Sequence, residues 1–123
     1  MLHQIIKLKA HKERRLRQQV VQGQQQYEKQ RFQQANLFQK REVQKNEWDA
    51  LKQETFTNLS KNDLSRLQKN LKAYYLKDNR LKNEILAIEN QCDSWLEEKK
   101  ELLQELRNLR IKQEKLNWII SEE

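Results

Sequence analysis

Proline is absent from this chain of 123 residues, and glycine and cysteine occur once each, as Gly23 and Cys92. Without proline, no residue is forced out of a helix, and the dominant residue types (Lys, Glu, Gln, Leu and Arg) are strong helix formers. A single cysteine excludes an intrachain disulfide and a cysteine-based zinc site. We expect Cys92 to be a packing residue, with a redox role as the alternative.

Long apolar runs are also missing. No segment approaches the roughly 18 apolar residues that a membrane-spanning helix needs. The first segment, MLHQIIKLKAHK, has lysines inside its short apolar stretch, unlike a signal peptide. We therefore expect a cytosolic protein without membrane insertion.

Charged residues (35%) nearly equal hydrophobic ones (36%), which is too polar a balance for a compact core. Long helices and intrinsic disorder are the competing interpretations, and regular apolar spacing separates them, because disordered chains lack it. In the second half, alternating steps of three and four residues form a heptad pattern with an apolar residue at every d position, as in a coiled coil. This seam of a and d positions contains Leu64, Leu67, Leu71, Tyr74, Asp78, Leu81, Ile85, Ile88, Cys92, Trp95, Lys99, Leu102, Leu106, Leu109, Gln113, Leu116 and Ile120.

The first half fits two patterns. The same heptad phasing gives a seam that is about half polar, and it contains Leu2, Ile6, Lys9, Glu13, Leu16, Val20, Gly23, Tyr27, Gln30, Gln34, Leu37, Arg41, Gln44, Trp48, Leu51, Thr55 and Asn58. An eleven-residue spacing describes this half at least as well, and it would let the apolar stripe drift around a straighter helix. Its rows are Ile5, Leu16, Tyr27 and Phe38, then Ala10, Val21, Phe32 and Val43, then Leu37, Trp48 and Leu59.

The segment TNLSKNDLS, residues 57–65, breaks the helical propensity and is predicted to be a turn. Ser60 with Asp63 resembles a capping box, and Asn62 or Asp63 could be the cap instead. Two helices of about 2–57 and 63–121, joined by a turn at about 58–62, can bury their stripes only by folding back on each other. The predicted fold class is therefore all-α: a single domain, residues 1–123, that forms an antiparallel coiled-coil hairpin.

Such a turn makes the numbers of facing residues sum to about 119 to 121. This register places Tyr27 near Trp95 and Arg41 opposite Asp78. We predict an ion pair between Arg41 and Asp78 that fixes the register, against the alternative that both side chains extend to water. The glutamines and Gly23 in the first half indicate a soft, weakly packed stretch.

Residues that carry catalytic or metal chemistry are scarce. His3 and His11 have no Cys, Asp or Glu at ligand spacing, Gly23 alone cannot form a phosphate loop, and no nucleophile has a neighbouring base. An extended hairpin is also expected to lack a concave pocket that could shift a pKa. The sequence predicts a non-enzyme without catalytic residues, metal or cofactor, whose function is contact with partners.

Positive charge is concentrated in the first half: residues 1–59 hold 12 Lys and Arg against 6 Asp and Glu, while residues 60–123 hold 13 against 12. Antiparallel pairing brings the basic N-terminal segment beside basic residues near the C terminus, so this end should attract an acidic surface. A solvated face is the alternative. Nucleic acid fits less well, because residues 7–17 lack interleaved aromatics and lie on the helix opposite the strong zipper. Membrane-surface binding would need a larger apolar face.

Among the apolar residues off the predicted seam, we expect Phe32, Val43, Phe56, Tyr75 and Leu76 to be exposed in an isolated hairpin. Exposed apolar residues along a hairpin suggest a docked partner. The alternative is that the eleven-residue drift turns Phe32 and Val43 inward.

A basic, proline-free chain of this length with two nearly equal helices, a central turn, no active-site chemistry and the segment HKERRLRQQ resembles the central-stalk proteins of type III secretion ATPases, the FliJ/YscO family with its EscO-like members. The resemblance covers the whole chain. It implies a non-catalytic cytoplasmic stalk at the face of a secretion apparatus. One monomer per hexamer would insert into the pore of a hexameric ATPase, promote its activity and link it to the export gate.

The resemblance also implies two contact surfaces. The ATPase-binding residues would be the basic residues of the terminal segments, namely Lys7, Lys9, Arg14, Arg15, Arg17, Arg107, Arg110 and Lys112. The export-gate surface would include Leu64, Tyr75 and Leu76, with chaperones as further candidate partners. The alternative function is a generic cytosolic coiled-coil scaffold or adaptor, such as a homodimer, without an ATPase partner.

Overall fold

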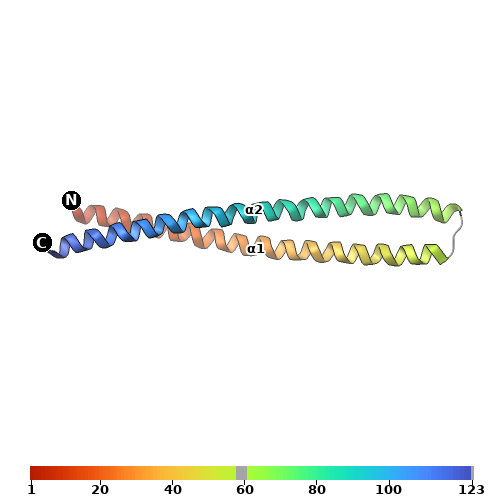
Figure 1. Cartoon of the computed structure of the whole chain (residues 1–123), viewed down its shortest axis with the longest axis horizontal. Helices are drawn as coiled ribbons and strands as arrows, with labels where there is room; N and C mark the ends of the chain where they lie inside the picture. The colour runs from red at the N-terminus through yellow and green to blue at the C-terminus, as the bar shows by residue number, and fades with distance from the viewer. Residues whose placement is uncertain (58–60, 123) are drawn as a thin grey trace. The chain divides into compact units, whose positions relative to one another are not determined.

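Two long helices form the fold. The computed structural model describes residues 1–57 and 61–122, and it contains α1 (Leu2–Thr57) and α2 (Lys61–Glu122), which pack antiparallel as a helical hairpin (Figure 1). The predicted all-α hairpin is confirmed. Neither helix is interrupted, as expected of a sequence without proline.

The start of α2 differs from the prediction. Residues 61 and 62, which the sequence assigned to the turn, are helical, so Asn62 and Asp63 lie inside α2 and neither is its cap. Asp63 instead lies in the first turn, where a carboxylate interacts favourably with the helix dipole. The expected Ser60 cap and the side chains of Thr55, Phe56, Asn58 and Leu59 lie outside the residues described.

The heptad phasing predicts which side of each helix is covered. On α2 every described seam position is buried or half-buried except Leu64, and on α1 the same holds from position 2 to position 48, polar residues included. The eleven-residue alternative is wrong, because Phe32 and Val43, which it would turn inward, are 69% and 48% exposed. The strict apolar stripe of α2 decides which face of α1 is covered, whatever residues that face carries.

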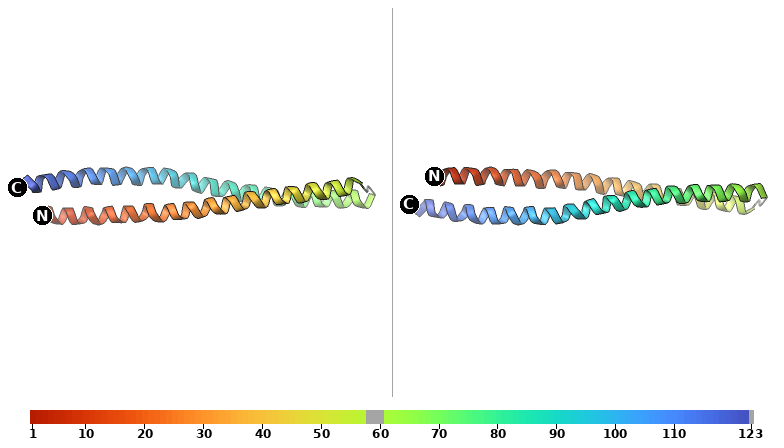
Figure 2. Two further views of the ribbon diagram at one scale, coloured as in Figure 1. Left: turned by 90° about the horizontal axis from the view of Figure 1, so that it is seen from below. Right: turned by 90° about the horizontal axis from the view of Figure 1, so that it is seen from above.

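The helix pair divides into two compact units. Unit 1 contains Met1–Lys29 and Cys92–Glu123, and unit 2 contains Gln30–Gln91. Within each unit a segment of α1 lies beside a segment of α2, and both chain termini lie in unit 1 (Figure 2). A single domain over residues 1–123 stays a prediction.

Unit 1 has an apolar core. Its cluster of buried residues comprises Leu16, Trp95, Leu102, Leu106 and Leu109, with Val20 and Tyr27 packed against it. Tyr27 therefore lies beside Trp95, as the register predicts. Cys92 is fully buried, which confirms that it is a packing residue.

Gly23 lies directly under the indole of Trp95. A Cβ atom at Gly23 would overlap the ring atoms Cη2, Cζ3 and Cζ2 of Trp95, so the absence of a side chain makes room for the ring. The next residue, Gln24, accepts hydrogen bonds from Trp95 Nε1 at 3.5 Å and from Lys99 Nζ at 3.0 Å. The interpretation of this stretch as weakly packed is wrong, because a missing side chain on one helix is filled by a large one on the other.

Unit 2 has a network of polar contacts between the helices. Among its described residues only Gln34 and Ile85 are buried. Gln34 Nε2 donates to Glu89 Oε2 at 2.6 Å and to the Ile85 carbonyl at 3.5 Å, and Arg31 Nη1 donates to the same Glu89 oxygen at 2.7 Å. A buried amide with these partners is satisfied, so the seam tolerates it.

The predicted pair of Arg41 and Asp78 is confirmed. Arg41 Nε donates to Asp78 Oδ1 at 2.7 Å, and Arg41 Nη2 donates to Oδ2 at 3.3 Å, a two-pronged geometry. The residue numbers sum to 119, within the expected register. Whether the pair fixes that register stays a prediction.

Candidate functional site

The predicted ATPase-binding residues all lie in unit 1, on the terminal segments of both helices. Seven of the eight are exposed, and Lys9 is half-buried at a seam position. Glu13 joins the two segments: its Oε1 accepts from Arg17 Nη2 at 2.6 Å on its own helix and lies 3.6 Å from Arg110 Nε on the other. The structure therefore brings the two basic segments together.

Most of this positive charge is uncompensated. Glu13 neutralises part of the charge of Arg17 and Arg110, but within residues 1–57 and 61–122 no carboxylate lies within ion-pair distance of the others in the predicted set. Those others are Lys7, Lys9, Arg14, Arg15, Arg107 and Lys112. Cations on both helices that have no carboxylate within ion-pair distance are available to attract an anionic surface.

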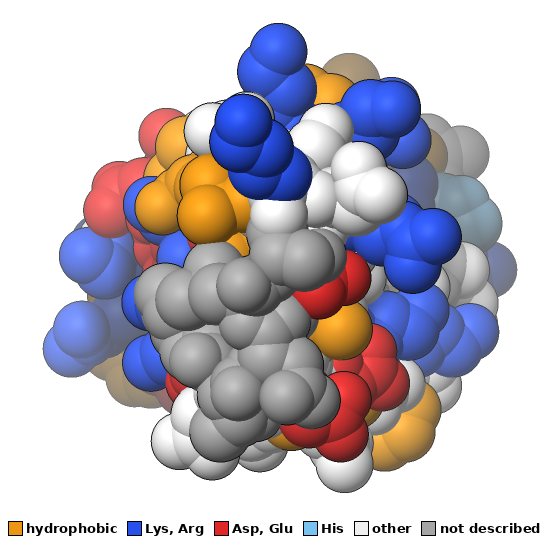
Figure 3. All heavy atoms as spheres, turned by 90° about the vertical axis from the view of Figure 1, so that its right-hand side faces the viewer, with side chains coloured by type: hydrophobic (Ala, Val, Ile, Leu, Met, Phe, Trp, Pro, Cys, Tyr) orange, Lys and Arg blue, Asp and Glu red, His pale blue; other side chains and the backbone are white. Residues whose placement is uncertain are grey.

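The predicted gate residues lie in unit 2, on the part of α2 that follows the turn. Leu64, Tyr75 and Leu76 are 47%, 56% and 62% exposed. The ring of Tyr75 packs at a tilt against Tyr74, with centroids 5.8 Å apart. Viewed from the turn side, Lys and Arg side chains project outward beside hydrophobic ones (Figure 3). Over the part of the chain that the structure describes, no second helix covers Tyr75 or Leu76.

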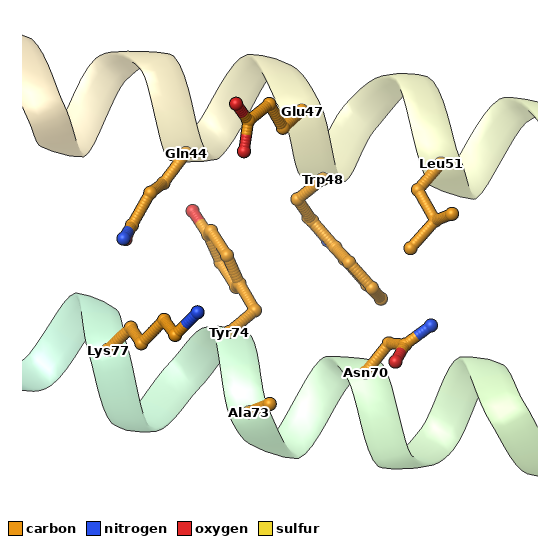
Figure 4. A pocket seen from close by; sticks show the side chains of 8 residues that line it. All are labelled: Gln44, Glu47, Trp48, Leu51, Asn70, Ala73, Tyr74 and Lys77. Carbon is orange, nitrogen blue, oxygen red and sulfur yellow. The ribbon is translucent and has the colours of Figure 1, made fainter.

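Unit 2 also contains open grooves, where the sequence predicts no concave pocket that could shift a pKa. One of about 250 Å³ is lined by both helices around the stacked rings of Trp48 and Tyr74, whose centroids lie 5.5 Å apart at 15° (Figure 4). Gln44 Oε1 borders this groove and is buried without a hydrogen-bond partner among the described residues.

Hydrogen bonds and burial in unit 2 shift the pKa values of Asp78, Glu89 and Tyr74. The hydrogen bond from Arg41 lowers the pKa of Asp78. Hydrogen bonds from Gln34 and then Arg31 lower the pKa of Glu89. Burial, followed by the charge of Asp78, raises the pKa of Tyr74. Each shift favours the charge state that keeps a cross-helix contact intact, and none places a group near neutral pH for acid–base catalysis.

The sequence interpretation missed one basic surface. Residues 61–82 hold seven Lys and Arg against two Asp and Glu, whereas residues 84–105 hold two against seven. The two blocks nearly cancel, so the net charge of the whole second half is close to zero. A count in windows of about three heptads would have found the basic block.

Other kinds of site are not indicated. Over the residues described, neither helix is long and apolar enough to cross a membrane, and no three His, Cys, Asp or Glu side chains cluster as metal ligands would. Comparisons with protein-family models, curated proteins and solved structures found no match for the chain.

Proposed function

We propose that this chain is the non-catalytic central stalk of a type III secretion ATPase at the cytoplasmic face of the secretion apparatus. The terminal segments in unit 1 would enter the pore of the hexamer, and the α2 surface of unit 2 would face the export gate. The proposal starts from the resemblance to the FliJ/YscO family. The structural observation that supports it most is the uncompensated cationic surface formed by both helices of unit 1.

The mechanism follows from symmetry. A two-helix stalk cannot contact six identical subunits in the same way, so it stabilises different conformations in different subunits and couples their turnover. The stalk supplies contacts, and the ATPase supplies catalysis. An acidic pore lining would speed insertion and make it sensitive to salt.

The test is ATPase turnover with and without the purified chain. We expect stimulation by the wild type and its loss with R14E/R15E/R17E, which also removes the bond from Arg17 to Glu13. The variant R107E/K112E leaves that bond in place and should lose stimulation too. Wild-type stimulation should weaken as salt rises.

The control K40E/K45E/K52E changes three exposed lysines of unit 2 and alters net charge as much as the triple arginine variant. It should stimulate like the wild type. Absence of stimulation by the wild type at every ratio of stalk to hexamer would overturn the proposal.

The second candidate is a scaffold that self-associates. The exposed Phe32 and Val43 favour it, because they lie eleven residues apart on the uncovered side of α1. Light scattering separates the two functions: a stalk should be a monomer at micromolar concentration, while a scaffold should be a dimer that F32S/V43S dissociates.

A further inference from the structure

We propose that the outward face of α2 between residues 61 and 90 is a docking site for an acidic amphipathic helix of a partner protein. The site extends the surface assigned above to the export gate, so the identity of its partner rests on the proposed function. The chemistry of that partner follows from the residues of unit 2 alone.

Leu76 is the centre of the face. Side chains four and seven positions away lie on the same side of a helix. Lys72 and Arg80 are therefore one turn from Leu76 on either side, and Lys69 is two turns away. All four are exposed, and Leu76 is 62% exposed. The same spacing adds Lys61, Ser65, Asn83, Ala87 and Asn90, which are also exposed.

Between residues 61 and 82 no carboxylate lies on this face, and the exposed Glu84 follows one turn after Arg80. The acidic residues of 61–82 are Asp63 and Asp78, which are half-buried on the side toward α1, and Asp78 already binds Arg41. Within the described residues no ion pair involves Lys61, Lys69, Lys72 or Arg80. A row of cations about 30 Å long, at 1.5 Å per residue, thus has no carboxylate within ion-pair distance among the residues that the structure describes.

The combination of one leucine and several cations indicates which kind of ligand binds this face. A nucleic-acid backbone would use the cations but gain nothing from Leu76. A bilayer surface would need a broad apolar face rather than one leucine. Protein interfaces combine an apolar anchor with a polar rim, and charges on the rim steer the partner and set its salt dependence. An amphipathic helix with carboxylates around an apolar residue complements both features along the row.

The first experiment titrates the full chain into a fluorescent synthetic helical peptide of about 20 residues, with four glutamates around two leucines on one face. The matched control peptide has glutamine in place of each glutamate. We expect the glutamate peptide to bind at least about tenfold more tightly at low salt, with an affinity that falls as salt rises. Equal binding of the two peptides would overturn the proposal.

The second experiment tests which residues of the chain bind the peptide. K69E/K72E/R80E should weaken binding of the glutamate peptide by at least about tenfold. The matched variant K40E/K45E/K52E reverses three exposed lysines on α1 of the same unit and should bind within about twofold of the wild type. Equal losses in both variants would show that only net charge matters and would overturn the site.

Leu76→Ser should lower the affinity for the glutamate peptide, because it removes an apolar contact. The slope of affinity against salt should stay unchanged, because no charge is removed. Vesicles containing anionic phosphatidylserine and a duplex RNA are the competing probes. Tighter binding of either one that K69E/K72E/R80E abolishes would assign the face to that ligand and overturn the protein proposal.

The outcomes separate this proposal from the stalk function. Loss of ATPase stimulation in R14E/R15E/R17E with intact peptide binding supports both proposals. Peptide binding without any ATPase stimulation overturns the stalk function alone. Stimulation without peptide binding overturns the docking site alone.

Discussion

In unit 1 the buried contacts between the helices are mainly leucines and an indole, whereas unit 2 combines half-buried apolar residues and stacked rings with a network of amides, carboxylates and guanidiniums. Both use the same heptad phasing. Apolar burial contributes most of the free energy of a coiled coil, and polar layers contribute specificity of register at some cost in stability. The contrast indicates that unit 1 supplies more of the stability and unit 2 more of the alignment of the helices.

The largest effect should come from the core of unit 1. Leu106 is 7% exposed, and Leu106→Ala should lower the free energy of unfolding by about 2 to 5 kcal/mol, measured by urea denaturation. Leu103, which is 47% exposed, is the matched control, and its replacement by alanine should cost less than about 1 kcal/mol. Equal losses would contradict the assignment of the core.

Gly23→Ala should have the next largest effect on the free energy of unfolding. Alanine normally stabilises a helix by about 1 kcal/mol relative to glycine. Here its Cβ would overlap Trp95, so we expect a net loss of about 1 to 3 kcal/mol. In a Trp95→Leu background the overlap is gone, and the same substitution should stabilise the protein. Stabilisation in both backgrounds would show that the ring moves aside freely.

Arg41→Leu tests the polar layer of unit 2. Because Arg41 and Asp78 are partly exposed, we expect a loss of only about 1 kcal/mol, together with a shift of the helix register measured by cross-helix NOEs. Lys45→Leu, at an exposed position one turn further along, is the control. Unchanged melting and register in the Arg41 variant would remove the proposed role.

The smallest effect on stability should appear at acidic pH. The pKa of Asp78 is lowered in the folded chain by its bond from Arg41, so its contribution to stability is present above about pH 4 and is lost as pH falls through that lowered value. Asp78→Asn should flatten stability against pH in this range, measured by urea unfolding at several pH values. A pH dependence in Asp78→Asn as steep as that of the wild type would contradict the prediction.

The fold was predictable because α2 carries a heptad stripe with an apolar residue at every d position, and any helix paired with it must present one face. The pair of Arg41 and Asp78 followed from that register. The eleven-residue alternative failed because apolar spacing on one helix does not say which face a partner covers. The prediction of weak packing at Gly23 failed for a related reason, since the packing of Gly23 depends on Trp95, which lies far away in sequence.

The candidate surfaces were predictable only in part. The basic terminal segments are visible as a charge run in α1, and antiparallel pairing adds their counterparts on α2. The cationic face around Leu76 was missed because an acidic block follows it in the same helix, so the two cancel in a count over half of the chain. The grooves beside Trp48 and Tyr74 depend on side-chain conformation, which sequence spacing does not determine.

The stacking of Trp48 on Tyr74 and the burial of Trp95 against Gly23 give each unit its own optical signal. Trp48 lies in unit 2, Trp95 in unit 1, and the third tryptophan, Trp118, is 64% exposed. Replacing Trp118 and one of the other two by phenylalanine leaves a single indole whose emission reports one unit. Intrinsic fluorescence can therefore follow how each half of the hairpin responds to a partner without any attached label.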